Sequence, residues 1–116
     1  MTPEDFRAAA LSWPEAVESS HMGTVDFRVR KKIFATLDGD KGLATLKLQP
    51  DEQAMLVELH GSVFFPANGS WGEKGWTKLQ LRDVPIEGVQ VGLEWAWRNI
   101  APSKLVAKYR EDKAGS

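Results

Sequence analysis

Residues 21–48, HMGTVDFRVRKKIFATLDGDKGLATLKL, decide the fold. Apolar and polar side chains alternate through this stretch with the two-residue period of a sheet that has one buried face. The charged run at 30–32 predicts a tight hairpin tip, and the glycines and aspartates at 38–42 predict a second turn. We therefore predict a meander of three antiparallel strands. Its expected buried positions are Phe27, Val29, Ile33, Ala35, Leu37, Ala44, Leu46 and Leu48.

Helices are predicted on both sides of the meander, because prolines stand at the first helical position with carboxylates close behind them. In the second of these helices, Met55, Leu56 and Leu59 are expected to form the buried stripe. The predicted elements outside the meander are a helix over 3–13, a weak strand over 16–22, a helix over 50–60, an irregular stretch over 62–75, a strand over 76–81, a helix over 86–101 and a last helical segment from 102.

This order, α-β-β-β-β-α-β-α, favours an α+β two-layer sandwich. We expect an antiparallel sheet of about five strands with helices mainly on one face. The length of 116 residues predicts that residues 1–116 form one domain, with 110–116 as a frayed tail.

Composition narrows the functional classes. Fifteen basic and sixteen acidic residues leave a formal net charge of −1, so binding to phosphate would need a local basic patch. The absence of cysteine excludes disulfides, thiolate metal sites and cysteine nucleophiles. The N-terminus lacks the pattern of a signal peptide, and no apolar run approaches the ~20 residues of a membrane span. The sequence therefore predicts a cytoplasmic protein that does not bind a membrane.

The outward phase of the predicted sheet supplies the first candidate site. Cations neutralise phosphates and exposed rings stack on bases, which is the chemistry of a nucleic-acid-binding face. Lysine and arginine also decorate the solvent face of ordinary antiparallel sheets, so that reading stays open. The candidate DNA contacts are Arg28, Arg30, Lys31, Lys32, Lys47 and Lys78, with Phe34 and Trp76 as stacking platforms.

The aromatic stretch at 62–76 supplies a second candidate. Phe64, Phe65 and Trp71, joined by His21, could line a small apolar pocket for a ligand or a protein partner. The alternative is a satellite core beneath a long loop, which is the commoner arrangement.

A third candidate is Trp95, which falls opposite the apolar stripe of the helix over 86–101. Either the terminal segment carrying Leu105 and Tyr109 covers this ring, or another protein or a second copy of the chain does. A catalytic role would require an acidic or hydroxyl partner for His21. With two histidines and no cysteine, we expect no metal, no cofactor and no enzymatic activity.

Several segments together resemble the MmcQ/YjbR family of small bacterial proteins. They are Trp13-Pro14-Glu15-Ala16-Val17-Glu18, His21-Met22-Gly23, Asp26-Phe27-Arg28-Val29, Lys32-Ile33-Phe34-Ala35-Thr36-Leu37 and Gly75-Trp76. The resemblance implies an α+β fold of the frataxin-like or secretion-chaperone-like kind, with a double-wing DNA-binding-like arrangement of hairpins. It brings no catalytic residues. The leading prediction is thus a DNA-binding module, and the alternative is a protein-interaction or small-ligand-binding domain that uses the 62–76 loop and Trp95.

Overall fold

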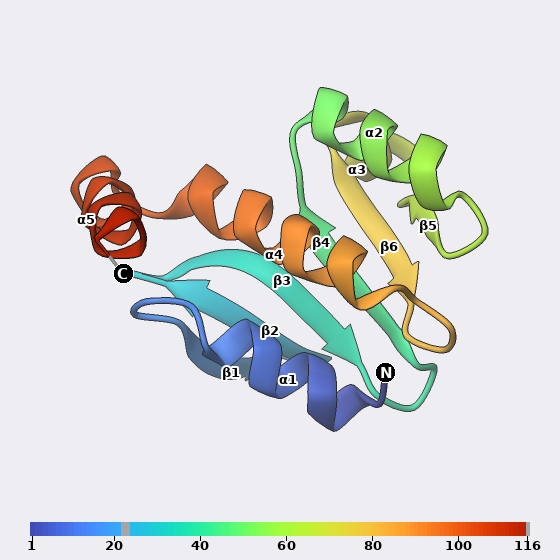
Figure 1. Ribbon diagram of the computed structural model, residues 1–116. Coiled ribbons are helices and arrows are strands. Elements are labelled where there is room, and N and C mark those ends of the chain that lie inside the picture. Colours follow the sequence, from blue (N-terminus) through green and yellow to red (C-terminus); the bar gives the residue numbers. More distant parts are fainter. Residues whose placement is uncertain (22–23, 116) are drawn as a thin grey trace.

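The computed structural model describes residues 1–21 and 24–115, apart from the side chain of His21. The described part forms an antiparallel sheet of six strands in the order β1-β2-β3-β4-β6-β5 (Figure 1). The strands are β1 (Val17–His21), β2 (Thr24–Val29), β3 (Lys32–Asp38), β4 (Leu43–Lys47), β5 (Phe64–Pro66) and β6 (Trp76–Gln80). The helices are α1 (Pro3–Leu11), α2 (Pro50–His60), α3 (Gly69–Glu73), α4 (Ile86–Ile100) and α5 (Ser103–Ala114).

The predicted α+β sandwich is confirmed, with one strand more than the expected five. Helices α1, α2 and α4 pack on one face of the sheet, and α5 lies beyond its end (Figure 1). Strand β5 and helix α3 both fall within the stretch that was expected to be irregular. Helix α5 continues to Ala114, and the fraying expected over 110–116 stays a prediction.

Helices α1 and α2 begin where the sequence predicts. Each has a proline in its first turn, and each has a capping box, made by Thr2 with Asp5 and by Gln49 with Glu52. The predicted buried face of α2 is only partly right. In α2 only Leu56 is buried, whereas Met55 and Leu59 are exposed. Two apolar side chains of the predicted buried stripe thus lie on the solvent-facing surface of α2.

A β-bulge between β2 and β3 changes the predicted register. Phe27 pairs with Ala35, but Arg28 pairs with Ile33, so Phe34 is the extra residue of the bulge. Phe34 is fully buried in the core, and Ile33 is half-buried on the other face. The prediction of Phe34 as an outward stacking platform is therefore wrong, as is the burial predicted for Ile33.

The core between sheet and helices centres on α4. Trp97 is fully buried, and its indole Nε1–H donates to the carbonyl oxygen of Pro14 at 3.0 Å. Its ring lies 5.5 Å from that of Trp13 and 5.3 Å from that of Tyr109, measured between centroids. Trp97 thereby joins the segment after α1, helix α4 and helix α5 at one end of the sheet. Within the described residues, no helix is long and apolar enough to cross a membrane.

Candidate functional site

The sheet face opposite α1, α2 and α4, called here the open face, carries a shallow groove of about 390 Å³. Paired strands bring its side chains together, because Thr36 pairs with Thr45 and Thr45 pairs with Lys78. The groove is lined by Ile33, Thr36, Thr45, Ala67, Asn68, Trp71, Trp76 and Lys78. Ile33 reaches this face only because of the bulge in β3.

Two tryptophans form one wall of the groove. The rings of Trp71 in α3 and Trp76 in β6 meet edge to face, with centroids 6.1 Å apart. Trp71 is 61% exposed, which is unusual for so large an apolar side chain. The Nζ atom of Lys47 lies 5.4 Å from the Trp76 ring centroid, and that of Lys74 lies 5.7 Å from the Trp71 centroid. Cations and exposed aromatic faces therefore share one surface.

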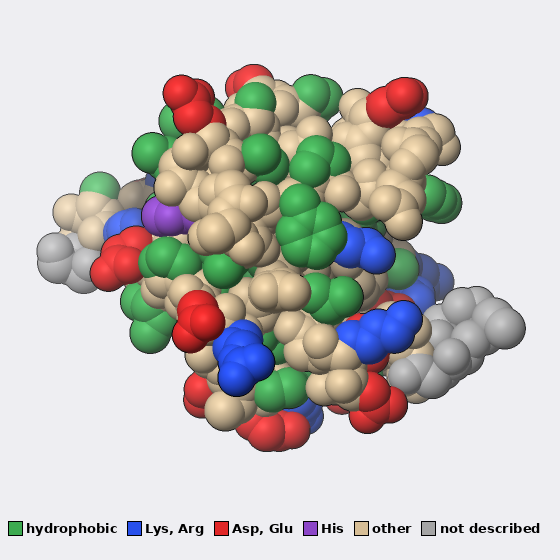
Figure 2. Space-filling view, turned by 90° about the vertical axis from the view of Figure 1, so that its right-hand side faces the viewer, with side chains coloured by type: hydrophobic (Ala, Val, Ile, Leu, Met, Phe, Trp, Pro, Cys, Tyr) green, Lys and Arg blue, Asp and Glu red, His purple; other side chains and the backbone are tan. Residues whose placement is uncertain are grey.

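The apolar surface continues to the β5 edge of the sheet. Figure 2 looks at the side of the molecule that carries β5 and α2 in Figure 1, and hydrophobic side chains gather across its middle with lysine or arginine beside them. Phe65 of β5 is 37% exposed and pairs with Lys78. Phe64, the preceding residue, is fully buried and lies in the core. The predicted aromatic pocket is therefore divided, with Phe65 and Trp71 outside and Phe64 inside.

Gln53 of α2 holds the α3 wall of the groove in place, a role that the sequence analysis missed. Its Nε2 donates to the carbonyl oxygens of Gly72 and Trp76 at 3.0 and 3.1 Å, and to Thr77 Oγ1 at 3.0 Å. Gln53 stands three residues before the buried Leu56, so it shares the inward face of α2. A polar residue at that spacing was the available signal.

Replacing Gln53 with methionine is expected to lower the free energy of unfolding by about 1–3 kcal/mol, because buried acceptors lose their donor while the side-chain volume is kept. Urea denaturation measures this change. The matched control is Gln90→Met on the exposed side of α4, which is expected to change stability by less than about 0.5 kcal/mol. Equal effects of the two substitutions would contradict the role assigned to Gln53.

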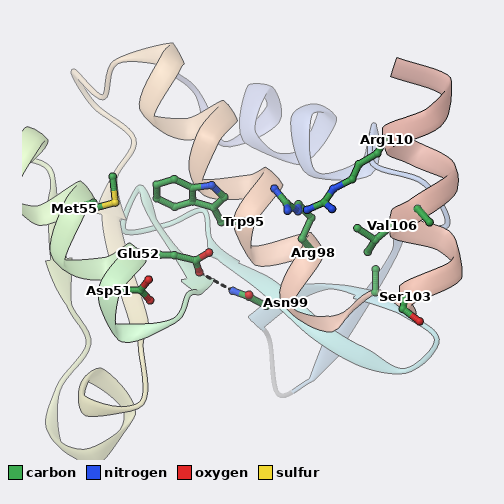
Figure 3. Close-up of a pocket in the computed structure, with 11 residues that line it drawn as sticks. Asp51, Glu52, Met55, Trp95, Arg98, Asn99, Ser103, Val106 and Arg110 are labelled. Atoms are coloured by element: carbon green, nitrogen blue, oxygen red, sulfur yellow. Dashed lines mark hydrogen bonds between the residues drawn. The ribbon is translucent and has the colours of Figure 1, made fainter. Parts of the chain in front are cut away.

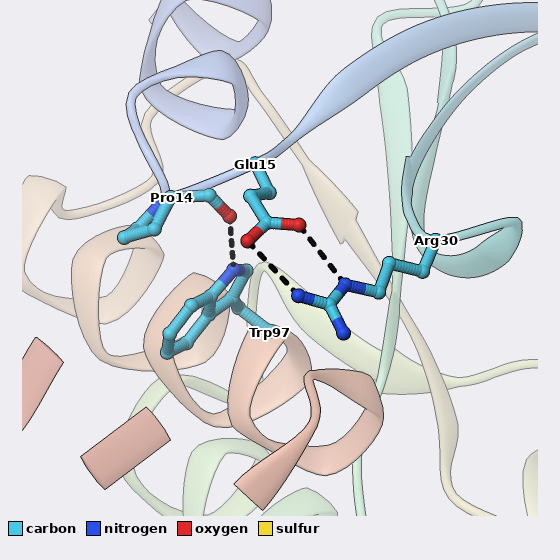
Figure 4. Close-up of polar contacts among 4 residues, drawn as sticks. All are labelled: Pro14, Glu15, Arg30 and Trp97. Atoms are coloured by element: carbon cyan, nitrogen blue, oxygen red, sulfur yellow. Dashed lines mark hydrogen bonds and ion pairs between the residues drawn. The ribbon is translucent and has the colours of Figure 1, made fainter. Parts of the chain in front are cut away.

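The predicted arginine contacts are engaged in ion pairs. Arg28 binds Asp26 through Nε–Oδ1 at 2.7 Å and Nη2–Oδ2 at 3.0 Å, and these hydrogen bonds raise the pKa of Arg28. Arg30 binds both carboxylate oxygens of Glu15, at 3.0 and 3.3 Å (Figure 4). The hydrogen bond from Arg30 lowers the pKa of Glu15. Asp26 is thus committed to Arg28, and neither arginine offers a free charge to DNA.

The hairpin tip retains two free cations. Arg30 and Lys31 have positive φ angles of 49° and 74°, as a two-residue type I′ turn requires. Lys31 and Lys32 are exposed and form no ion pair with a described residue. The side chain of His21, the remaining candidate pocket residue, lies outside the described part of the chain.

Of the predicted DNA face, the structure brings together Trp76, Lys47 and Lys78, and it adds Trp71 to them.

The third candidate site of the sequence analysis is Trp95 of α4. Trp95 is half-buried, and it borders a cleft shared with Met55 of α2 and Val106 of α5. Tyr109, which belongs to one of the two alternative covers considered for Trp95, packs on Trp13 and Trp97. Among the described residues, no group of three or more His, Cys, Asp or Glu side chains is placed to hold a metal ion.

Comparison with known proteins places the fold. The sequence profile of the YjbR family matches residues 11–99. A Deinococcus radiodurans protein with a DUF419 domain has a similar structure, with a TM-score of 0.75, 20% identity, and coverage of 89% of this chain and 80% of that one. A Pseudomonas syringae protein has a TM-score of 0.67 and 17% identity over 87% of this chain and 100% of that one. No curated protein matches by sequence. The family match covers most of the chain, and the chain belongs to the YjbR family.

Proposed function

We propose that the open face binds single-stranded nucleic acid, with unpaired bases stacked on Trp71 and Trp76. The observation that carries this proposal is the pair of tryptophans on an uncovered sheet, with the ammonium groups of Lys47 and Lys74 beside their rings. Lys78 lines the same groove. Aromatic platforms combined with cations are what proteins use to bind single strands with little sequence preference. Under this proposal, the protein is a binding module and not an enzyme.

The charges of the groove favour a polyanion over a neutral ligand. Lys47, Lys74 and Lys78 form no ion pair within the described part of the chain. Phosphates could draw the two ring-bound ammonium groups away, at a cost of about 0.5–1 kcal/mol for each exposed cation–π contact. Base stacking returns about 1–3 kcal/mol per base, so the expected affinity is modest.

A single strand fits this surface better than a duplex does. Of the predicted DNA contacts, Arg28 and Arg30 are ion-paired and Phe34 is buried. Trp71 and Trp76 can stack only on bases that are not already paired and stacked within a helix. The double-wing mode of binding to DNA stays a prediction, and Lys31 and Lys32 are the candidate cations at the hairpin tip that form no ion pair with a described residue.

Fluorescence anisotropy with a labelled oligothymidylate tests the proposal. Trp71→Ala is expected to weaken binding roughly 5- to 100-fold, the equivalent of one lost stacking contact. Ile86→Ala removes an exposed apolar side chain from α4, away from the groove, and is expected to leave the affinity unchanged. With three phosphates neutralised, the logarithm of the affinity should fall with the logarithm of salt with a slope of about −2, and Lys78→Gln should reduce that slope by about 0.7.

The same groove could instead hold a protein. The observation in favour of that second candidate is that the exposed Phe65 and the half-buried Ile33 extend the apolar surface of the open face beyond what a base needs. The absence of oligonucleotide binding at low salt, or equal binding by the Trp71→Ala variant, would reject the nucleic-acid proposal in favour of a protein partner.

A further inference from the structure

A second cavity lies on the helical side of the molecule, between α2, α4 and α5, and is called here the helix cleft. Its volume is about 660 Å³, within the range of small-molecule sites in proteins. Figure 3 shows its side chains, with Asp51, Glu52 and Met55 of α2 on one side, Arg98 and Arg110 on the other, and Trp95 of α4 between them. It is separate from the sheet groove, since no residue lines both.

Two arginines stand at the basic end of the helix cleft, and of these two only Arg98 forms an ion pair with a described residue. Arg98 Nη1 lies 3.5 Å from Glu94 Oε2, and Lys113 Nζ lies 3.5 Å from the other oxygen of Glu94. Arg110 forms no ion pair with a described residue. The guanidinium groups of Arg98 and Arg110 are directed toward the same part of the cleft (Figure 3). Two guanidinium groups brought together from different helices suit a carboxylate or phosphate group.

The acidic end is held rigidly. Glu52 Oε1 accepts hydrogen bonds from the backbone N–H of Gln49 at 2.8 Å and from Asn99 Nδ2 at 2.9 Å. Asn99 Nδ2 also donates to the carbonyl oxygen of Lys47 at 3.0 Å. These bonds fix the carboxylate and leave Oε2 without a hydrogen bond from any described residue. Together with the exposed Asp51, this end can accept a cationic group.

One wall of the helix cleft is apolar and partly aromatic. Trp95 is half-buried, and Met55 of α2 is exposed beside the cleft. Met55 was predicted to be buried in the apolar stripe of α2, but it is exposed and contributes to the apolar wall of the cleft. The helix cleft therefore combines two carboxylates on its α2 side, an apolar wall and two guanidinium groups on its opposite side.

We propose that the helix cleft binds a small zwitterion of peptide-like chemistry. Its free amine would meet Asp51 and Glu52, its carboxylate would meet Arg98 and Arg110, and an apolar or aromatic side chain would lie against Trp95 and Met55. The charges of the cleft lining sum to zero, which disfavours a multiply charged anion and favours a ligand with one charge of each sign at separate ends. A cavity of this size holds a di- or tripeptide.

The test uses the tripeptide Ala-Phe-Ala with free termini, with its C-terminus amidated, and with its N-terminus acetylated. Binding is followed by NMR of the 15N-labelled protein, which carries five tryptophan indole N–H signals, with that of Trp95 assigned from a Trp95→Phe variant. The free tripeptide is expected to shift the Trp95 signal. Each blocked form is expected to bind about tenfold more weakly, because a charge-assisted hydrogen bond is lost.

Arg110→Gln connects the ligand to the protein. In this variant the free tripeptide is expected to bind about tenfold more weakly, and C-terminal amidation should then make little further difference. Lys104→Gln, which removes an exposed cation from the same helix outside the cleft, should behave as the wild type does. The proposal is overturned if the free tripeptide causes no shift at millimolar concentration, or if amidation weakens binding to the wild type and to the Arg110→Gln variant equally.

Discussion

Replacing Gly75 with alanine is expected to lower the free energy of unfolding by about 3 kcal/mol or more. Gly75 has a φ angle of 109°, which L side chains rarely adopt. A Cβ atom there would lie 1.9 Å from the carbonyl oxygen of Leu48 and 2.8 Å from its carbonyl carbon. Both atoms belong to the backbone, so the clash can be relieved only by moving the end of β4 and the start of β6 away from each other. Urea denaturation followed by circular dichroism measures the loss.

Gly69→Ala is the matched control for this prediction. Gly69 also has a positive φ, 65°, but no atom lies within 4 Å of the position a Cβ would take. The substitution therefore adds only backbone strain, about 1–2 kcal/mol. A loss for Gly75→Ala no greater than that for Gly69→Ala would contradict the close approach of residue 75 to Leu48.

The second large effect is expected at Trp97, where substitution by alanine should cost about 3–5 kcal/mol. The ring is fully buried, contacts Trp13 and Tyr109, and donates from Nε1 to the Pro14 carbonyl oxygen. Removing it leaves a cavity where α4, α5 and the segment after α1 meet. Thermal or urea unfolding measures the change.

Two further substitutions separate the contributions of Trp97. Trp97→Phe keeps most of the packing but leaves the Pro14 carbonyl without its donor, and is expected to cost about 1–3 kcal/mol. Trp71→Phe, at the exposed tryptophan of α3, is expected to cost less than about 0.5 kcal/mol. If Trp97→Ala were as mild as Trp71→Phe, the packing of α5 against α4 would be wrong.

The sequence predicts those parts of the fold that local chemistry determines. The alternation in residues 21–48 specifies the meander, and the prolines with their capping boxes place the starts of α1 and α2. The bulge at Phe34 could not be predicted from the sequence. The segment Ile33-Phe34-Ala35 is apolar throughout, so either Ile33 or Phe34 could face the core. One inserted residue then exchanged the faces of Phe34 and Ile33.

The candidate sites were less predictable because their contacts span long distances in sequence. Lys47, Lys78 and Trp76 could be placed on one face by strand alternation alone. The pairing of Arg30 with Glu15, by contrast, joins residues 15 apart, and the contact of Asn99 with Glu52 joins residues 47 apart. No periodicity links such positions. Arg30 is no longer a candidate DNA contact, because its charge is paired with that of Glu15.

The pairing of β4 with β6 makes residues 48–75 an excursion whose two ends are adjacent, because Lys47 is the register partner of Trp76. This excursion contributes Ala67, Asn68 and Trp71 to the sheet groove, and Asp51, Glu52 and Met55 to the helix cleft. Its length and composition can therefore diverge between relatives while the β1–β4 meander is retained, since insertions between adjacent anchor points cost little conformational entropy. A change of length or composition in this one segment would thus alter the sheet groove and the helix cleft together.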